Sequence, residues 1–166
     1  MPLAFGATAG AEIDRILERY PTRQAALIPT LWVAQREFGY LTHEAMELVA
    51  ARLELPPAKV ISTATFYTMF NKRPVGRYHL QVCKNISCYL RNSDSVIEVI
   101  ERKLGIRPGE TTPDKLFTLS EVECLAACGR GPVVQVNEDY HEWQTPESVA
   151  ALLDQLAAKA AGAEGG

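Results

Sequence analysis

The chain has 166 residues, of which 47% are hydrophobic and 22% charged, a composition typical of a globular protein with one domain or two small ones. Its formal net charge of −3 provides no basic face for nucleic acid and no polybasic membrane signal. The most apolar run, at 25–34, contains Pro29 and is too short to cross a bilayer. We therefore expect proteins or a small cofactor as partners, no nucleic acid and no direct membrane insertion.

The N-terminal segment has no Lys or Arg before Arg15 and lacks the apolar block of a secretory signal, so we expect a cytoplasmic protein. In a reducing compartment, the four cysteines of this chain favour metal binding or catalysis over disulfide formation.

Residues 10–70 have the apolar spacing of helices. Gly39 is placed to end one of them, and Thr42 can cap the next. No catalytic grouping occurs in this half, and its aromatic residues Trp32, Phe66, Tyr67 and Phe70 are interpreted as core or docking residues. The expected helices cover 11–20, about 23–37, 43–53 and 58–70.

Pro74 and Gly76 interrupt the helical pattern, so we expect an N-terminal helical domain at 1–75 and a second domain at 76–166. In the second domain, Ser93 or Asp94 can cap a helix and Thr145 can cap the last one. The tail at 157–166 is expected to be frayed. The patterns predict a strand at 78–82, a helix at 93–105, strands at 116–120, 133–136 and 140–143, with a turn at 137–139 between the last two, and a helix from Pro146.

This order of elements predicts two parallel strands joined by a helix, with a hairpin that extends the same sheet. It is the thioredoxin-like arrangement, in which Pro132 lies where that fold often has a cis proline. The expected fold class is therefore α+β, an N-terminal helical bundle followed by a thioredoxin-like α/β domain.

All four cysteines lie in the second half, as the pairs Cys83 and Cys88 and Cys124 and Cys128. Each pair follows a predicted strand, and neighbouring parallel strands would deliver both pairs to one edge of the sheet. One helical turn would bring Cys124 and Cys128 onto the same face, before Gly129, Gly131 and Pro132 stop the helix. We therefore expect four thiolates to converge.

The spacing within each pair separates the possible chemistries. Structural zinc sites usually have two residues between their cysteines, whereas the longer loops here suit a [2Fe–2S] cluster with one pair on each iron. The small residues Gly129 and Gly131 would let backbone N–H groups approach the sulfurs. A zinc site with four cysteines stays open, as do four unrelated buried thiols, while neither pair has the Cys-x-x-Cys spacing of a thiol–disulfide enzyme. His43, His79 and His141 are possible ligands in principle.

The segment "CKNISC", followed after 35 residues by "CLAACGRGPVVQVNEDYHE", resembles the family of [2Fe–2S] E subunits of NADH:quinone oxidoreductase, respiratory complex I. The segments "GRYHLQVC" and "TATFYTMF" are similar to the same family. The resemblance implies that Cys83 and Cys88 bind one iron of the cluster and that Cys124 and Cys128 bind the other. Ala126 departs from the family pattern, which frequently has Gly there.

The resemblance also implies a function. It implies an electron-transfer subunit whose cluster exchanges electrons with the FMN of the NADH-oxidising flavoprotein subunit, beside a larger iron–sulfur subunit, in a complex peripheral to the membrane. This chain has no nucleotide-binding motif, so we expect no NADH oxidation from it alone. Similar modules serve NAD-linked hydrogenases and formate dehydrogenases, and a zinc-stabilised interaction module is the alternative of another class.

Overall fold

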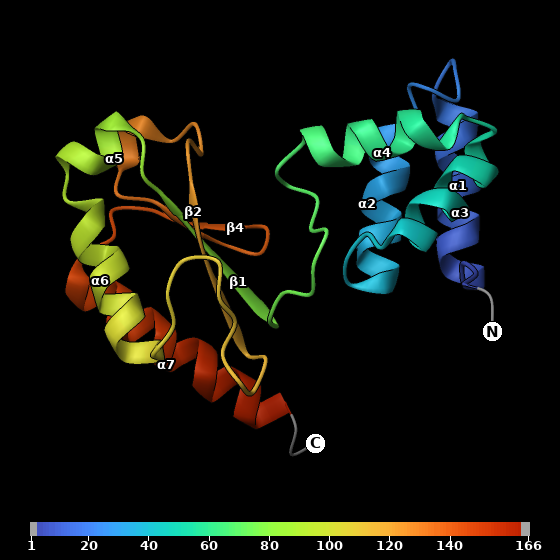
Figure 1. Cartoon of the computed structure of the whole chain (residues 1–166). Coiled ribbons are helices and arrows are strands. Elements are labelled where there is room, and N and C mark those ends of the chain that lie inside the picture. The colour runs from blue at the N-terminus through green and yellow to red at the C-terminus, as the bar shows by residue number, and fades with distance from the viewer. Residues whose placement is uncertain (1–2, 164–166) are drawn as a thin grey trace. The chain divides into compact units, whose positions relative to one another are not determined.

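The computed structural model of the chain describes residues 3–163 (Figure 1). Its contacts separate two compact units at the bond between Pro74 and Val75. The first unit contains helices only among its described residues, and the second is built on a sheet. The helical bundle followed by an α/β unit confirms the expected α+β class.

The first unit is a bundle whose helices bury one apolar stripe each. Gly39, with φ of 80°, follows α2, and the Thr42 hydroxyl accepts a hydrogen bond of 3.0 Å from the Ala45 N–H at the start of α3, both as predicted. Large side chains from every helix are fully buried in this unit: Ile13, Leu31, Leu53 and Val60, with Phe70 from the following loop. The four helices are α1 (Ala7–Arg19), α2 (Leu27–Phe38), α3 (His43–Leu53) and α4 (Pro57–Phe66).

Two helix ends in this unit differ from the prediction. Helix α2 begins at Leu27 instead of residue 23, because a separate turn precedes it, in which the Thr22 hydroxyl accepts a hydrogen bond from the Ala25 N–H. Helix α4 ends at Phe66 instead of residue 70, and the chain continues extended through Tyr67. Phe66, the last residue of this helix, is 77% exposed.

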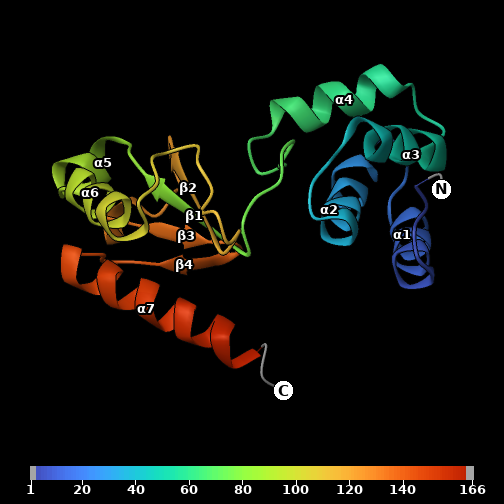
Figure 2. The ribbon, with the colours of Figure 1, turned by 60° about the horizontal axis from the view of Figure 1, so that its bottom comes forward.

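The second unit contains a four-stranded sheet in the order β2-β1-β3-β4. As expected, β1 and β2 are parallel and the β3–β4 hairpin extends the same sheet antiparallel to β1. Figure 2 shows the strands side by side, with helices packed beside them. The strands are β1 (Tyr78–Cys83), β2 (Phe117–Val122), β3 (Val134–Val136) and β4 (Asp139–His141), and the helices are α5 (Ile86–Leu90), α6 (Ser93–Leu104) and α7 (Pro146–Ala163).

One core joins the sheet to helices α6 and α7. Alternate strand residues such as Leu80 and Leu119 are fully buried there, together with Ile100 of α6 and Leu153 of α7. Because every second strand residue points to this face, the period-2 pattern in the sequence located it correctly. No helix within residues 3–163 is long and apolar enough to span a membrane.

Three local predictions in this unit are wrong. Helix α6 is preceded by Asn92 with φ of 70°, and Ser93, expected as a possible cap, is instead buried in the first turn. The hairpin turn consists of residues 137 and 138 alone, since Asn137 takes the positive φ of 55° that a two-residue turn requires. Residues 157–166 were expected to fray, but helix α7 continues through Ala163, because Ala160 packs into the core. The rest of that tail, 164–166, lies outside the described residues.

Candidate metal centre

Both cysteine pairs lie where the two parallel strands end. Cys83 is the last residue of β1 and is in register with Val122, the last residue of β2. Cys124 follows Val122 by two residues. The residue between these two is Glu123, whose carbonyl oxygen is 3.9 Å from the Cys83 sulfur. The parallel pairing therefore brings the two loops to the same edge of the sheet, as the sequence predicted.

Cys88 is held by a short helix that sequence reasoning missed. Helix α5 has five residues, and the Asn85 side chain accepts a hydrogen bond of 2.8 Å from the Ile86 N–H at its start. Five residues are too few for a helical period to be visible, although Asn is a common residue before a helix. The helix turns Cys88 inward, so that it is 2% exposed, next to Cys83 at 3%.

The loop from Cys124 to Cys128 does not form the expected helical turn. Ala126 has φ of 55°, in the left-handed region, which breaks any helix between the two cysteines. A 3-10 turn, η1 (Cys128–Arg130), begins only at the second one. The Ala126 N–H donates a hydrogen bond to the Cys124 sulfur, with 3.3 Å between nitrogen and sulfur. The amide that reaches a sulfur is thus that of Ala126, and both thiols of this loop are exposed.

Gly131 provides the room that Cys88 needs. A Cβ atom at Gly131 would lie 2.9 Å from the Cys88 sulfur, closer than real Cβ contacts come. Its φ of −69° suits any residue, so the requirement here is space and not backbone freedom. The following bond to Pro132 is cis. Gly129 has open space instead, because a Cβ atom there would have no atom within 4 Å.

The thiols also affect one another electrostatically. Burial is the largest of the causes that raise the pKa of the Cys88 thiol to about 11, followed by a hydrogen bond with Cys83 and by the charges of Cys83 and Cys128. Metal binding at Cys88 must therefore displace the proton of its thiol. No three His, Cys, Asp or Glu side chains in residues 3–163 are grouped to hold a single metal ion. The donor set nonetheless fits a two-iron cluster, because it offers four thiols as two pairs from two loops, with a glycine beside one sulfur.

The three histidines have other surroundings. His79 lies on β1, and its Nε2 is 2.8 Å from the Ser120 hydroxyl of β2; burial lowers the pKa of its imidazole. His43 pairs with Glu47 on α3, at 3.3 Å between Nε2 and Oε1. His141 is on β4. None of the three lies in a cysteine loop.

A family model described as thioredoxin-like [2Fe–2S] ferredoxin matches residues 13–157. The chain belongs to this family. The match covers residues of both units, and the family implies a [2Fe–2S] cluster.

Curated relatives cover most of the chain. The E subunit of the NADH-quinone oxidoreductase of Rickettsia conorii is 45% identical over 86% of this chain and 87% of its own. The second E subunit of Rhizobium meliloti is 46% identical over 91% of this chain and 90% of its own. A solved NAD+-reducing [NiFe]-hydrogenase in the H2-reduced state matches 77% of this chain and 22% of its own, with 20% identity and a TM-score of 0.67. That likeness shows the fold alone.

Proposed function

We propose that the chain is the [2Fe–2S] electron-transfer subunit of an NADH:quinone oxidoreductase, and that it exchanges electrons with the FMN of the NADH-oxidising flavoprotein subunit. The observation that carries the proposal is the placement of both cysteine pairs in the loops that begin at the same end of the parallel strands β1 and β2. Family membership and the two E-type relatives from NADH-quinone oxidoreductases, at 45% and 46% identity, support it.

Within this proposal, Cys83 and Cys88 hold one iron and Cys124 and Cys128 hold the other. The cluster supplies one-electron chemistry when bound. The buried pair keeps water from one side, whereas the exposed pair forms the edge that a partner can approach. The hydrogen bond from the Ala126 N–H to the Cys124 sulfur stabilises negative charge on that sulfur.

The proposed partners are the FMN- and NADH-binding flavoprotein subunit and the larger iron–sulfur subunit of the same complex, at the cytoplasmic side of the membrane. The helical unit enlarges the surface that binds the flavoprotein. Phe66 at 77% exposure and Tyr67 at 37% are its available aromatic residues. Phe70 is buried and Trp32 packs against the helical core, so neither is a candidate for this contact.

Metal content tests the cluster. After anaerobic purification we expect a brown protein with two irons and two acid-labile sulfides per chain. Stoichiometric zinc in a colourless protein would replace this proposal by the zinc-stabilised module. Ser at each of Cys83, Cys88, Cys124 and Cys128 should destroy or strongly perturb the electron paramagnetic resonance (EPR) spectrum, and a variant with an unchanged spectrum would remove that residue from the ligand set.

Reconstitution tests the electron partner. The isolated chain should not oxidise NADH, and adding the flavoprotein should let NADH reduce the cluster. A fragment that begins at Gly76 should keep the EPR spectrum but bind the flavoprotein more weakly than the full chain. The full-length Phe66→Ser variant should lose affinity without losing stability, because that ring is exposed. Equal binding by fragment and full chain would refute this role of the helical unit. If the cluster is reduced only by the flavoprotein of a hydrogenase or of a formate dehydrogenase, that enzyme would be the favoured parent complex instead.

A further inference from the structure

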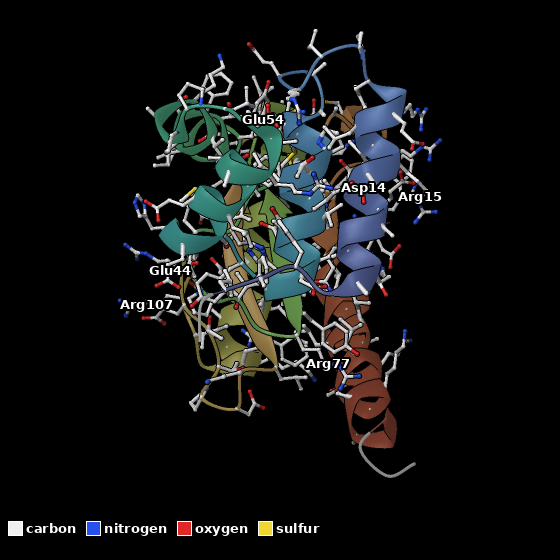
Figure 3. All side chains as sticks on the ribbon, turned by 90° about the vertical axis from the view of Figure 1, so that its right-hand side faces the viewer. Asp14, Arg15, Glu44, Glu54, Arg77 and Arg107 are labelled. Carbon is white, nitrogen blue, oxygen red and sulfur yellow. The ribbon has the colours of Figure 1, made fainter. Side chains whose placement is uncertain are left out.

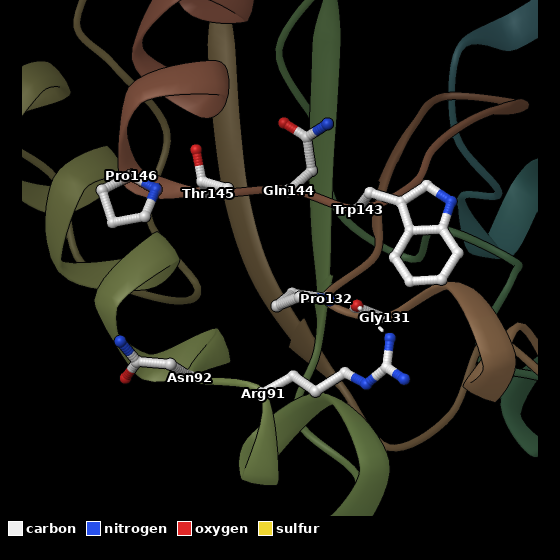
Figure 4. A pocket seen from close by; sticks show the side chains of 8 residues that line it. All are labelled: Arg91, Asn92, Gly131, Pro132, Trp143, Gln144, Thr145 and Pro146. Carbon is white, nitrogen blue, oxygen red and sulfur yellow. Dashed lines mark hydrogen bonds between the residues drawn. The ribbon is translucent and has the colours of Figure 1, made fainter.

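Three loops of the second unit meet at Arg91, which directly follows α5 (Figure 4). Its Nη1 donates a hydrogen bond of 3.3 Å to the carbonyl oxygen of Gly131, in the loop after Cys128. Its guanidinium carbon lies 5.2 Å from the centre of the Trp143 ring, in the loop between β4 and α7. The three residues line one surface cavity of about 480 Å³. One side chain thus connects both cysteine loops to the β4–α7 loop.

The Trp143 ring is held in place by its backbone. The Trp143 N–H donates to the Arg130 carbonyl at 2.8 Å, and the next N–H, of Gln144, donates to the Pro132 carbonyl at 2.9 Å. Trp143 has φ of 54°, which costs a bulky residue about 1–2 kcal/mol, and its side chain is still 57% exposed. A strained backbone that presents an exposed ring to a cation points to a function of that contact.

The charge of Arg91 is not neutralised by a carboxylate. Two other cations belong to the cysteine loops, and each has an acidic partner: Lys84 pairs with Glu121 at 3.1 Å and Arg130 with Glu142 at 3.0 Å. Among residues 3–163, Arg91 forms no salt bridge, and its guanidinium is directed to a carbonyl and a ring. No ion pair in this part of the chain therefore offsets its positive charge.

Arg91 is also close to a proposed ligand. Gly131, whose carbonyl it binds, lies so near Cys88 that a Cβ there would be 2.9 Å from the sulfur. These contacts place the guanidinium carbon within about 12 Å of that sulfur, given standard bond lengths. Reduction adds one electron to the site and hence one negative charge beside Cys88, which a fixed cation at this distance favours.

We propose that Arg91 is a positioning residue that joins the two cysteine loops and raises the reduction potential of the cluster through its charge. The proposal rests on the proposed function, in which Cys88 is a ligand. With an effective dielectric constant of about 20, one charge at this distance changes the equilibrium constant for reduction on the order of tenfold. Tenfold corresponds to about 59 mV for a one-electron couple.

The test is a redox titration of the cluster-loaded full chain, followed by EPR and with iron determined in each sample. Arg91→Gln should lower the equilibrium constant for reduction about tenfold, whereas Arg91→Lys, which keeps the charge, should recover most of the difference. Arg77→Gln is the matched control (Figure 3 labels Arg77). The Arg77 guanidinium also lies over a ring, 5.8 Å from the centre of that of Tyr78. Arg77 precedes β1 at the end opposite Cys83, so that about 20 Å of strand separates the two residues. Arg77→Gln should therefore leave the reduction potential unchanged.

An Arg91→Gln variant with full iron content and an unchanged potential would overturn the inference and leave the proposed function standing. The same shift in Arg77→Gln would also overturn it, because position would then not matter. If the Arg91→Gln chain does not hold the cluster, the Trp143→Leu variant tests the inference instead. It removes the ring over which the Arg91 guanidinium lies and so frees that charge toward solvent. Trp143→Leu should lower the reduction potential by less than is expected for Arg91→Gln, and an unchanged potential would refute the inference. A wild-type chain without a [2Fe–2S] cluster would overturn both proposals.

Discussion

Replacing Gly131 by Ala tests the packing around Cys88 with a single methyl group. The new Cβ would lie 2.9 Å from the Cys88 sulfur, whereas ordinary contacts begin at 3.4 Å, so the sulfur or the loop must move by about 0.5 Å. The sulfur has one torsion with which to escape, and the same Cβ would be 3.5 Å from the Cys88 Cα atom. Overpacking of this kind costs about 1–3 kcal/mol.

We expect the metal-free Gly131→Ala chain to unfold about 5–20 °C below wild type, given about 4–8 °C per kcal/mol for a unit of this size. The assay is thermal unfolding followed by circular dichroism. A displacement of 0.5 Å also exceeds the roughly 0.2 Å tolerance of metal–ligand distances, so iron retention after gel filtration should fall.

Gly129→Ala is the control for this variant, because it adds the same methyl group two residues earlier, where no atom lies within 4 Å. It should unfold at the wild-type temperature or slightly above and keep its iron. If Gly131→Ala and Gly129→Ala show the same unfolding temperature and iron content, the reasoning about space beside Cys88 is refuted.

Three further predictions concern single residues. Ala126→Gly should raise the free energy of unfolding by about 0.5–1 kcal/mol in urea titrations, because Gly accepts the φ of 55° without strain; an unchanged midpoint would contradict the strain. In the metal-free chain at pH 8, iodoacetamide should modify the exposed Cys124 and Cys128 well before the buried Cys83 and Cys88, and mass spectrometry showing one common rate would be inconsistent with the burial of that pair. Burial lowers the pKa of His79 below 6.5, so the unfolded chain binds that proton first and the free energy of unfolding should fall as the pH drops below about 6.5. His79→Gln should flatten this pH dependence, and an identical slope in both proteins would assign it to other groups.

Local patterns in the sequence determined much of this protein. The period-2 run at β1 and the apolar stripes of α6 and α7 reflect which side chains face a core, so the sequence alone shows them. The spacing of the cysteines identified both candidate pairs because each loop follows a strand. Gly39 at the end of α2 and Thr42 at the start of α3 are likewise local signals, because each is adjacent to the helix that it ends or begins.

Tertiary structure alone decided how the candidate site is built. Nothing in "CKNISC" or "CLAAC" separates a buried pair of thiols from an exposed one, because burial depends on Val133 and other residues that pack against them from elsewhere in the chain. The same holds for the space that Gly131 leaves for Cys88, 43 positions away in the sequence, and for Arg91 on the ring of Trp143. A helical turn was expected between Cys124 and Cys128, but Ala126 between them has positive φ, and its N–H reaches the Cys124 sulfur. Local propensities differ by about 1 kcal/mol per residue or less, and packing between distant segments outweighs them.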